Sequence, residues 1–329
     1  MNWRGKKVAI TGAGGFIGSH LARTLVDAGA DVRALVHYNS RNHWGHLEEL
    51  PHEVLSDVEI VSGDVTDAFS MERFVAGREY VFHLAALIGI PFSYIAPQLY
   101  VQVNIQGTLN ILEACRKHGV EKLVHTSTSE TYGTATYTPI DEKHPLQGQS
   151  PYSASKIAAD KLAESYYRSF GLPVAVARPF NTYGPHQSAR AVIPTIITQS
   201  IQGGKIKLGN LTPIRDFNYV ADTINAFLLI AASSHTVGQV LNICSGAGIT
   251  IDKLAQKILR LLDMDVPIED DGERQRPDNS EVFRLEGNAG LLMKLTDWKP
   301  GYSLNDGLRL TIEYIKENMK SYKPTLYNV

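Results

Sequence analysis

Short apolar runs alternate with segments of helical periodicity along the first half of the chain. The runs lie at residues 8–10, 32–36, 58–61, 80–84, 123–125 and 174–177. Between the first two runs, apolar side chains at positions 17, 21 and 25 recur at the spacing of one helix face, and Gly29 follows where a helix end is expected. Strands that alternate with helices predict an α/β fold with a doubly wound parallel sheet and right-handed crossovers.

End signals delimit two later helices. One helix covers residues 97–118 and is expected to stop at Gly119. The other starts with Ser150 as N-cap and Pro151 in the first helical position, and Gly171 closes its far end. Both helices are long enough to cross one face of a parallel sheet.

The regular alternation weakens after about residue 180. Turn-rich stretches follow at 182–185 and 203–204, and a strand-like run at 240–243 returns to the sheet pattern. We predict that residues 1–180, with a returning strand near 237–245, form a Rossmann domain. Residues 181–329 should form a smaller, interleaved C-terminal α/β lobe built from several segments.

Composition and charge exclude several classes of protein. Of 329 residues, 43% are apolar and 20% are charged, with 32 Lys and Arg against 34 Asp and Glu, as in ordinary globular proteins. The net charge of −2 argues against a nucleic-acid partner. The longest apolar run, 226–232, is too short to span a membrane, and the first residues lack a signal-peptide core, so we expect a cytoplasmic protein. Cys115 and Cys244 provide neither a disulfide framework nor a zinc site.

Gly12, Gly15 and Gly18 carry the strongest local signal. They follow a strand and open a helix that begins near Phe16 and Ile17. Glycines there permit a tight turn and let a pyrophosphate approach backbone N–H groups at the positive end of the helix. A glycine triplet by itself would also fit a structural turn, but in this strand-turn-helix context it predicts dinucleotide binding.

The end of the second strand bears on the choice between NAD and NADP. An acidic residue there normally accepts the ribose 2′-hydroxyl of NAD, but this chain has His37 and Arg41 and no carboxylate before Glu48. A cation could attract a 2′-phosphate, which favours NADP, although an exposed Arg41 is also an ordinary surface residue. Asp64 and Val65 follow the third strand and are expected near the adenine; alternatively, Asp64 caps the next turn.

Tyr152 and Lys156 lie four residues apart and therefore on one face of the second helix. A free tyrosine is a poor base at neutral pH. A nearby ammonium and a positively charged nicotinamide both favour the phenolate, so the pair can remove a proton from a substrate hydroxyl while hydride leaves the same carbon. Downstream of the glycine motif, this spacing predicts a catalytic pair.

These features resemble the extended short-chain dehydrogenase/reductase family, and within it the NAD-dependent nucleotide-sugar epimerases and dehydratases. The resemblance covers nearly the whole chain and is carried by residues 11–18, Asn104, 127–133, Tyr152, Lys156 and 178–185. It implies a tightly held NAD or NADP regenerated in each turnover, oxidation of a hexose at C4, and a homodimer formed through the helices near 97–118 and 151–170. The expected cofactor contacts are Gly12, Gly15, Phe16, Ile17, Gly18, His37, Arg41, Asp64, Val65, Ala85, Ala86, Asn104, Ser127, Tyr152 and Lys156.

Residues 125–133 discriminate between the reactions of this family. A 4-epimerase needs no carboxylate there, whereas this chain has Glu130. The resemblance implies that Thr128 bonds the 4-hydroxyl and that Glu130 takes the C5 proton, so that water leaves C6 and hydride returns to C6. Ser129 stands where dTDP-glucose dehydratases carry Asp, as in the Thr-Ser-Glu pattern of GDP-mannose 4,6-dehydratases, and the acid that protonates the leaving group stays open.

Other interpretations remain at this stage. The protein could be a nucleotide-sugar 4-epimerase, or elimination could stop at a 5,6-ene product. Glu130 could also be a solvated carboxylate at a strand end. A cofactor-sensing protein without turnover is a remote alternative, because such a protein could lose Tyr152 or Lys156 freely and this chain has both.

Arginines are expected around the diphosphate of a nucleotide sugar, since their forked guanidinium suits phosphate oxygens. Each arginine could also be an ordinary surface charge. We expect Arg178 to pack against other protein groups and not to contact the substrate. Residues 191–194 and 208–209 are expected beside the base. The substrate contacts that the resemblance implies are Asn181, Arg190, Val192, Arg215, Arg274 and Arg276.

Three segments resemble a narrower group. Residues 37–45, 85–91 and 145–152 are similar to bacterial dehydratases that act on UDP- or GDP-linked N-acetylglucosamine in pathways to legionaminic, pseudaminic or related amino sugars. This likeness implies a sugar with an acetamido group. The chemistry of the residues alone does not predict that group. His83 and His125 lie at strand ends without further metal ligands, so we expect packed or hydrogen-bonded histidines and no metal site.

Overall fold

Seven parallel strands form the central sheet in the part of the chain that the computed structural model describes, residues 2–324 and 326. Their order is β10-β6-β5-β4-β1-β2-β3, and the direction of winding reverses between β1 and β4. The predicted doubly wound sheet is therefore confirmed. The strands are β1 (Lys7–Thr11), β2 (Asp31–His37), β3 (Val58–Gly63), β4 (Tyr80–His83), β5 (Lys122–Thr126), β6 (Val174–Pro179) and β10 (Val240–Ile243).

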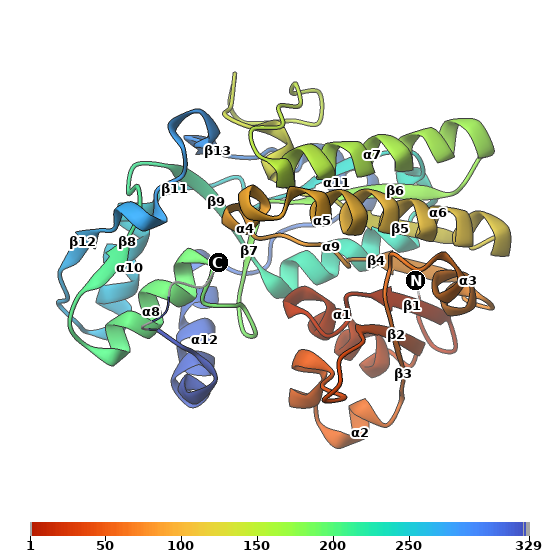
Figure 1. The fold of residues 1–329 in the computed structure, drawn as a ribbon, viewed down its shortest axis with the longest axis horizontal. Coiled ribbons are helices and arrows are strands. Elements are labelled where there is room, and N and C mark those ends of the chain that lie inside the picture. Colours follow the sequence, from red (N-terminus) through yellow and green to blue (C-terminus); the bar gives the residue numbers. More distant parts are fainter. Residues whose placement is uncertain (1, 325, 327–329) are drawn as a thin grey trace.

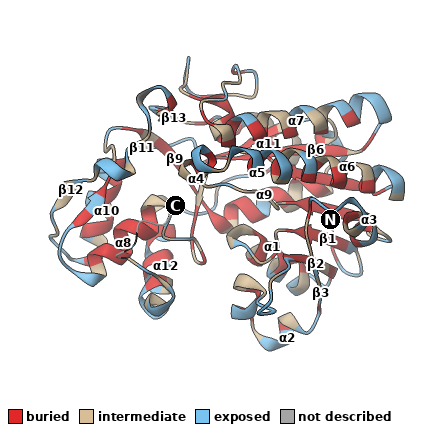
Figure 2. Cartoon of the chain, in the orientation of Figure 1, coloured by how far each residue is buried: buried red, intermediate tan, exposed pale blue. Residues whose placement is uncertain are grey.

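Strand side chains alternate between two buried cores. Val8 and Ile10 belong to one core while Ala9 belongs to the other. Phe82 and Val81 divide in the same way. Because successive side chains of a strand point to opposite faces, a sheet covered on both faces needs the continuous apolar runs seen in the sequence. Figure 2 shows the buried strands between helices whose outer faces are exposed.

Helices cover both faces of the sheet (Figure 1). Contacts link α3, α6 and α7 on one face, and α1, α9 and α11 on the other. Their bounds are α1 (Phe16–Asp27), α3 (Ala68–Val75), α6 (Gly107–His118), α7 (Pro151–Phe170), α9 (Val220–Ala232) and α11 (Gly290–Thr296). As predicted, the Ser150 side chain caps α7 by accepting a hydrogen bond from the Ser153 backbone N–H, and Gly171 ends it with a φ of +66°.

The helix predicted over residues 97–118 contains a change of pitch. α5 (Pro97–Tyr100) passes into a π-helical segment, η2 (Val101–Gln106), before α6 continues to His118. Gly119 then adopts a left-handed conformation and ends the helix, as expected. The π turn contains Asn104, whose side chain points into the protein and is 1% exposed.

A second group of elements lies at the left of Figure 1. It contains a sheet in which β9 pairs with β7, β11 and β13, and a two-stranded sheet of β8 and β12. The strands are β7 (Asn181–Tyr183), β8 (Ile206–Leu208), β9 (Ile214–Tyr219), β11 (Gly248–Thr250), β12 (Ile268–Asp270) and β13 (Arg284–Leu285), and the helices are α8 (Val192–Gln202), α10 (Ile251–Leu262) and α12 (Leu304–Glu317). The charged segment 270–277 begins as the end of β12 and contains one 3-10 turn.

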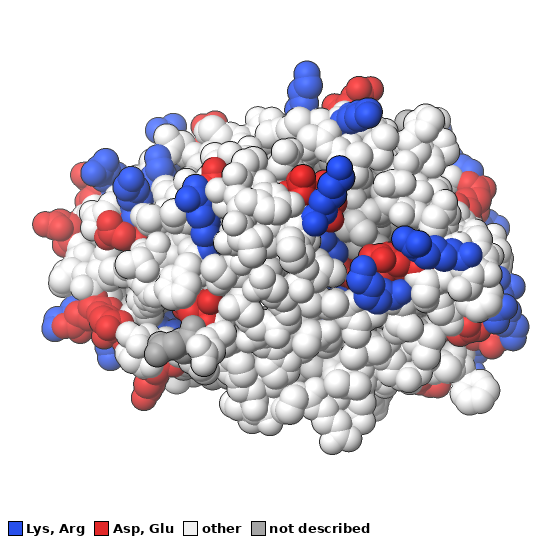
Figure 3. Space-filling view, turned by 90° about the horizontal axis from the view of Figure 1, so that it is seen from above, with Lys and Arg blue, Asp and Glu red and all other residues white. Residues whose placement is uncertain are grey.

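Short helices complete the described structure. They are η1 (Gly45–Glu49), α2 (His52–Leu55), α4 (Ile90–Ile95), η3 (Ser129–Tyr132), η4 (Ser234–Thr236), η5 (Gly272–Arg274), η6 (Asp278–Ser280) and η7 (Met319–Ser321). Among residues 2–324 and 326, no helix combines the length and the apolar character needed to cross a membrane. Figure 3 shows basic and acidic side chains interspersed on one face of the molecule, around a broad uncharged area.

Candidate active site

The glycine turn lies at the point where the sheet reverses its winding. Gly12 has a φ of +71°, and a Cβ there would stand 2.8 Å from the backbone nitrogen of Ala85. A Cβ on Gly18 would stand 2.2 Å from the carbonyl oxygen of Gly12. Gly15 precedes α1 without a side-chain cap on the helix. A turn that only glycine can form, before uncapped helix N–H groups, fits a dinucleotide pyrophosphate.

The insert after β2 packs over this turn. The His46 backbone N–H donates to the carbonyl of Gly14 at 2.9 Å, and a Cβ on Gly14 would lie 2.6 Å from the carbonyl oxygen of Trp44. Arg41 is exposed. Within the insert, the Asn39 side chain accepts hydrogen bonds from the backbone of Arg41 and His43. The insert therefore places Arg41 near the end of β2, where the sequence predicts the adenosine ribose.

Asp64 caps the turn after β3, which is one of the two roles considered for it in the sequence. Its Oδ1 accepts from the backbone N–H and the hydroxyl of Thr66, each at 2.8 Å, so it caps the turn after β3. Its Oδ2 lies 3.4 Å from His37 Nε2. Burial raises the pKa of Asp64, but the bonds from Thr66 and the proximity of His37 outweigh burial and lower it. The adenine contact of Asp64 and Val65 stays a prediction.

Asn104 joins two parts of the predicted cofactor site. Its side chain accepts from the Leu87 N–H at 2.8 Å and donates to the Leu87 carbonyl at 3.0 Å and to the Ser155 hydroxyl at 2.9 Å. Leu87 follows Ala85 and Ala86 after β4, and Ser155 lies on α7. These three hydrogen bonds of Asn104 are to protein groups, so its role as a direct cofactor contact stays a prediction.

Tyr152 and Lys156 lie on the buried face of α7, as the four-residue spacing predicts. The Lys156 ammonium donates to the carbonyl of Thr126 at 2.6 Å, at the end of β5. Burial lowers the pKa of Lys156 to about 8, an effect that the carboxylate of Asp160 opposes. Burial raises the pKa of the Tyr152 phenol; a hydrogen bond with Thr128 opposes this rise and the charge of Glu130 adds to it. The phenol thus needs positive charge nearby to act as a base.

Glu130 is held by the turn that follows β5. Thr128 caps η3, and its hydroxyl accepts the Glu130 N–H at 3.2 Å. The carboxylate Oε2 of Glu130 lies 3.5 Å from Nη1 of Arg276, and the side chain is 14% exposed. Ser129 is buried. The structure therefore brings Thr128, Glu130 and Tyr152 together at the carboxyl ends of the strands, where ligands of such sheets bind.

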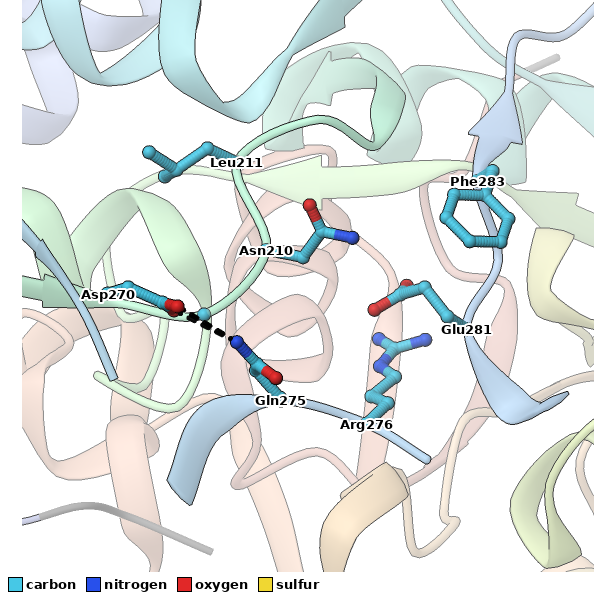
Figure 4. Close-up of a pocket in the computed structure, with 8 residues that line it drawn as sticks. Asn210, Leu211, Asp270, Gln275, Arg276, Glu281 and Phe283 are labelled. Carbon is cyan, nitrogen blue, oxygen red and sulfur yellow. Dashed lines mark hydrogen bonds between the residues drawn. The ribbon is translucent and has the colours of Figure 1, made fainter. Parts of the chain in front are cut away.

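Two arginines approach Glu130 from the second group of elements. Arg215 on β9 lies 3.5 Å from Glu281, and Arg276 lies 3.5 Å from Glu130. Arg276 and Glu281 also line a pocket of about 340 Å³ and point toward one another there (Figure 4). Nη1 of Arg276 is buried and donates no hydrogen bond to the described residues. Buried guanidinium groups beside a polar pocket can bind a diphosphate.

The other predicted substrate residues lie around this pocket or away from it. Asn181 is half-buried on β7, and Val192 begins α8. Arg190 is exposed, with its guanidinium 3.3 Å from the position of a Cβ on Gly89. Arg274 pairs with Asp271 at 2.9 Å and its backbone carbonyl packs against Gly209. Arg274 is therefore paired with Asp271, whereas Arg276 faces Glu130.

A buried ionic network lies beside Lys156, and the sequence analysis missed its centre, Asp160. The Asp160 carboxylate accepts from Arg178 and from Ser127, each at 2.6 Å, and lies 3.3 Å from His125. Burial raises the pKa of Asp160, but Arg178, His125 and Ser127 outweigh burial and hold it well below its ordinary value. Asp160 follows Tyr152 and Lys156 at the same four-residue interval, and that spacing was the available signal.

The two strand-end histidines and Arg178 are packed as expected. His83 bonds Thr11 at 2.8 Å and Thr108 at 3.1 Å, and Arg178 is 2% exposed with its guanidinium over the ring of Tyr132. Among the residues described by the structure, no group of three or more His, Cys, Asp or Glu side chains is arranged to hold a metal ion.

The sequence matches one family model over most of its length. Residues 9–311 match the model described as GDP-mannose 4,6 dehydratase. The chain is 31% identical over 323 residues to a dTDP-glucose 4,6-dehydratase of Mycobacterium tuberculosis, with 97% of this chain and 96% of the relative covered. It is 28% identical over 328 residues to the mouse dTDP-D-glucose 4,6-dehydratase, with 97% and 91% covered.

Solved structures include both dehydratases and epimerases with this fold. The dTDP-glucose 4,6-dehydratase DesIV of Streptomyces venezuelae, solved with NAD bound, superposes with a TM-score of 0.85 at 29% identity and covers 96% of this chain and 99% of its own. A UDP-N-acetylglucosamine 4-epimerase of Methanobrevibacter ruminantium has a TM-score of 0.87 at 30% identity and covers 96% and 100%. The fold alone therefore does not separate the two reactions.

Proposed function

This chain belongs to the GDP-mannose 4,6-dehydratase family of NAD-dependent epimerases and dehydratases, and we propose that its substrate is UDP- or GDP-linked N-acetylglucosamine. The protein is a nucleotide-sugar 4,6-dehydratase with an NAD(P)-type cofactor. The observation that carries the proposed mechanism is the position of Glu130, which shares one site with Thr128 and Tyr152 and faces Arg276. The sugar is proposed from the likeness of residues 37–45, 85–91 and 145–152 to dehydratases of that group.

Tyr152 and Lys156 handle the proton of the 4-hydroxyl in this mechanism. Thr128 bonds the same hydroxyl and orients it toward the phenol oxygen. Lys156, fixed on the Thr126 carbonyl, supplies a positive charge that favours the phenolate. A dinucleotide held by the glycine turn would supply the hydride acceptor for C4 and the hydride donor for C6, and its oxidised nicotinamide would place a second positive charge beside the phenol.

Glu130 performs the elimination. Once C4 is a carbonyl, the hydrogen on C5 is acidic, and the Glu130 carboxylate removes it. Ser129 occupies the position of the Asp in dTDP-glucose enzymes. Its hydroxyl is a much weaker acid than a carboxyl group and cannot take the place of Asp in protonating the C6 hydroxyl. We therefore assign the second proton step to Glu130 as well: the protonated acid returns its proton to the hydroxyl on C6, which leaves as water. A proton from solvent then reaches C5.

Arg215 and Arg276 are the proposed ligands of the diphosphate. Both guanidinium groups face the cleft beside Glu130 and Glu281 and are largely buried. Phosphate oxygens would supply the hydrogen bonds that the buried Nη1 of Arg276 lacks among the described residues. The pocket beside Gly209 and Asn210 is then the place of the base.

NADP is the preferred cofactor in this proposal. β2 ends at His37 without a carboxylate, and exposed Arg41 follows in the insert over the glycine turn. Both side chains can meet a 2′-phosphate, whereas a carboxylate at the strand end would repel it. NAD is the alternative, since the DesIV structure was solved with NAD.

A homodimer is proposed through the α5, α6 and α7 helices. Large apolar side chains are exposed on this part of the surface: Ile95, Leu99, Val101, Tyr167 and Phe170. Exposed apolar side chains gathered on neighbouring helices are typical of a protein interface.

The reaction is tested by product analysis in deuterated water. Purified protein is incubated with UDP-N-acetylglucosamine or GDP-N-acetylglucosamine, each with NADP or NAD added, and the products are examined by NMR. We expect a 4-keto sugar with a new C6 methyl group and deuterium at C5, because Glu130 removes a proton that solvent replaces. Turnover should be faster with NADP than with NAD.

Each alternative has its own spectrum. Inverted configuration at C4 with an unchanged C6 would identify a 4-epimerase, which the Methanobrevibacter relative supports. Vinyl protons at C6 would identify the 5,6-ene product. If neither sugar nucleotide is turned over while dTDP-glucose is dehydrated, the proposed acetamido substrate is wrong and the assignment as a 4,6-dehydratase stands.

The pKa of Lys156 predicts an alkaline limit for activity. Because burial lowers this pKa to about 8, the ammonium loses its proton above pH 8 and no longer favours the Tyr152 phenolate. We expect kcat/KM to fall above pH 8, and Lys156→Arg to remove that fall because a guanidinium keeps its charge. The folded protein also binds fewer protons than the unfolded chain between pH 8 and about 10.4, so stability should rise with pH over that window. A kcat/KM that stays level to pH 9.5 would contradict the assignment.

A further inference from the structure

The segment before α7 belongs to residues 145–152, one of the three stretches on whose likeness the proposed sugar rests. No physical role has yet been given to this stretch. Residues 145–150 run alongside the turn that carries Glu130. The Gln147 backbone N–H donates to the carbonyl of Thr131 at 2.9 Å. Gly133, with a φ of +64°, leaves room for this segment, because a Cβ there would stand 2.4 Å from Oε1 of Gln149.

Gln149 connects this turn to a second segment, residues 274–281, which we name the arginine strap. Oε1 of Gln149 accepts the Thr134 N–H at 2.5 Å. Nε2 of Gln149 lies 3.4 Å from the carbonyls of Asn279 and Glu281. The carbonyl of Gln149 accepts the Ser280 hydroxyl at 2.6 Å. One residue therefore contacts the Glu130 turn through its amide oxygen and the arginine strap through its amide nitrogen and backbone.

The arginine strap has two further attachments near the site. The hydroxyls of Ser280 and Tyr94 lie 2.5 Å apart, which ties the strap to α4. The Thr134 hydroxyl donates to the carbonyl of Glu281 at 3.2 Å. Within the strap, Arg276 faces Glu130 and Glu281 faces Arg215. The position of the strap thus sets the distance between Arg276 and the carboxylate of Glu130, and Glu281 joins the strap to Arg215 on β9.

We propose that Gln149 is a positioning residue that aligns the arginine strap with the Glu130 turn. It touches neither the sugar nor the cofactor in this assignment; it fixes the relative position of the group that holds the diphosphate and the group that takes the C5 proton. The inference rests on the proposed function, because Arg276 and Glu130 have those roles only there. Alignment matters because a small displacement of a reacting or binding group changes rates and affinities strongly.

Three variants separate the two contacts of Gln149. Ser280→Ala removes the strap hydroxyl that bonds the Gln149 carbonyl and Tyr94, and it leaves the Thr134 contact in place. Gln149→Ala removes the side-chain contacts to both the turn and the strap. Gln147→Ala is the matched control, because the bond to Thr131 is made by the Gln147 backbone and the Cβ is kept. The measurements are Kd for GDP and UDP, KM and kcat for the sugar nucleotide, and Kd for NAD and NADP.

We expect Ser280→Ala to weaken nucleotide binding and raise KM by roughly tenfold, as for the loss of about one net hydrogen bond, with kcat close to wild type. Gln149→Ala should do the same and also lower kcat, because the Glu130 turn loses its own anchor. Gln147→Ala should match wild type in all measurements. All three should bind NAD and NADP normally, since the hydrogen bonds of Gln149 and Ser280 described above join the Glu130 turn, the strap and α4, and none of them is to the glycine turn.

Two results would overturn the assignment. One is a Gln149→Ala protein whose nucleotide Kd and kcat both stay within twofold of wild type. The other is a Gln149→Ala protein that loses cofactor affinity as much as nucleotide affinity, which would indicate a general structural role. If Gln149→Ala does not fold, Ser280→Ala with an unchanged nucleotide Kd overturns the proposal instead. The Kd measurements with GDP and UDP do not depend on turnover, so a wrong sugar would show in the product spectra and leave this test intact.

Discussion

Glu130→Gln should reduce dehydration by about a thousandfold, within the range of 10²–10⁴ typical of general acid–base groups. The amide has nearly the shape of the carboxylate but cannot take the C5 proton or return it to the C6 hydroxyl. Oxidation at C4 should persist, because Tyr152, Lys156 and Thr128 are unchanged. Rapid mixing of the enzyme with sugar nucleotide should therefore show reduced nicotinamide at 340 nm without formation of the 4-keto-6-deoxy product.

The controls for this variant follow from the contacts of Glu130. Its removal also takes the partner of Arg276 away, so KM and the nucleotide Kd must be measured to separate binding from chemistry. Glu130→Asp keeps the charge on a shorter side chain and should retain more activity than Glu130→Gln. Solvent deuterium should stay out of C5 in Glu130→Gln. A variant with more than a tenth of wild-type dehydration would show that another group takes the proton.

Asp160→Asn should destabilise the folded protein by about 3–5 kcal/mol, the cost of leaving one member of a buried ion pair without its partner. Arg178 would stay buried at 2% exposure with its 2.6 Å carboxylate contact gone. Because the pKa of Asp160 is held well below its ordinary value, its contribution is present above about pH 4, the unfolded value, and is lost as pH falls through the folded value. Urea unfolding at pH 7 and at lower pH values measures both effects.

Two further variants make the Asp160 prediction specific. Asp27→Asn removes an exposed carboxylate that lies 3.7 Å from Arg23, and it should change stability by less than about 0.5 kcal/mol. Replacing the pair together, as Asp160→Asn with Arg178→Met, should recover much of the loss because no buried charge stays unpaired. A loss of 1 kcal/mol or less in Asp160→Asn would mean that water or local movement solvates Arg178.

The sequence predicted those parts of the fold that depend on local pattern. The strands and their helices followed from apolar runs and end signals, and Ser150, Gly119 and Gly171 mark the ends as expected. The Tyr152 and Lys156 pair could be placed on one face because helix spacing is fixed. The division into residues 1–180 with 237–245 and residues 181–329 stays a prediction.

Contacts between distant segments could not be derived from local pattern. Asp160 meets Arg178 and His125 only after α7, β5 and β6 have packed, and a polar residue in a helix is more often exposed. The pairing of Glu130 with Arg276 joins residues 146 positions apart through the arginine strap. Arg274 and Arg276 carry the same side chain two residues apart, and the turn between them decides which of the two faces Glu130.

The π turn at residues 101–106 fixes the number of residues that this helix must contain if Asn104 is to reach its partners. A π turn holds one residue more than an α-helical turn of the same height. Deleting a single residue there would leave an α-helical turn of the same height, so the flanking helical segments would keep their relative orientation while the residues within the turn shift. That shift would carry Asn104 away from Leu87 and Ser155. The irregular turn therefore connects the loop after β4 to α7 through one inward-facing amide, and a regular helix of one residue less would break that connection.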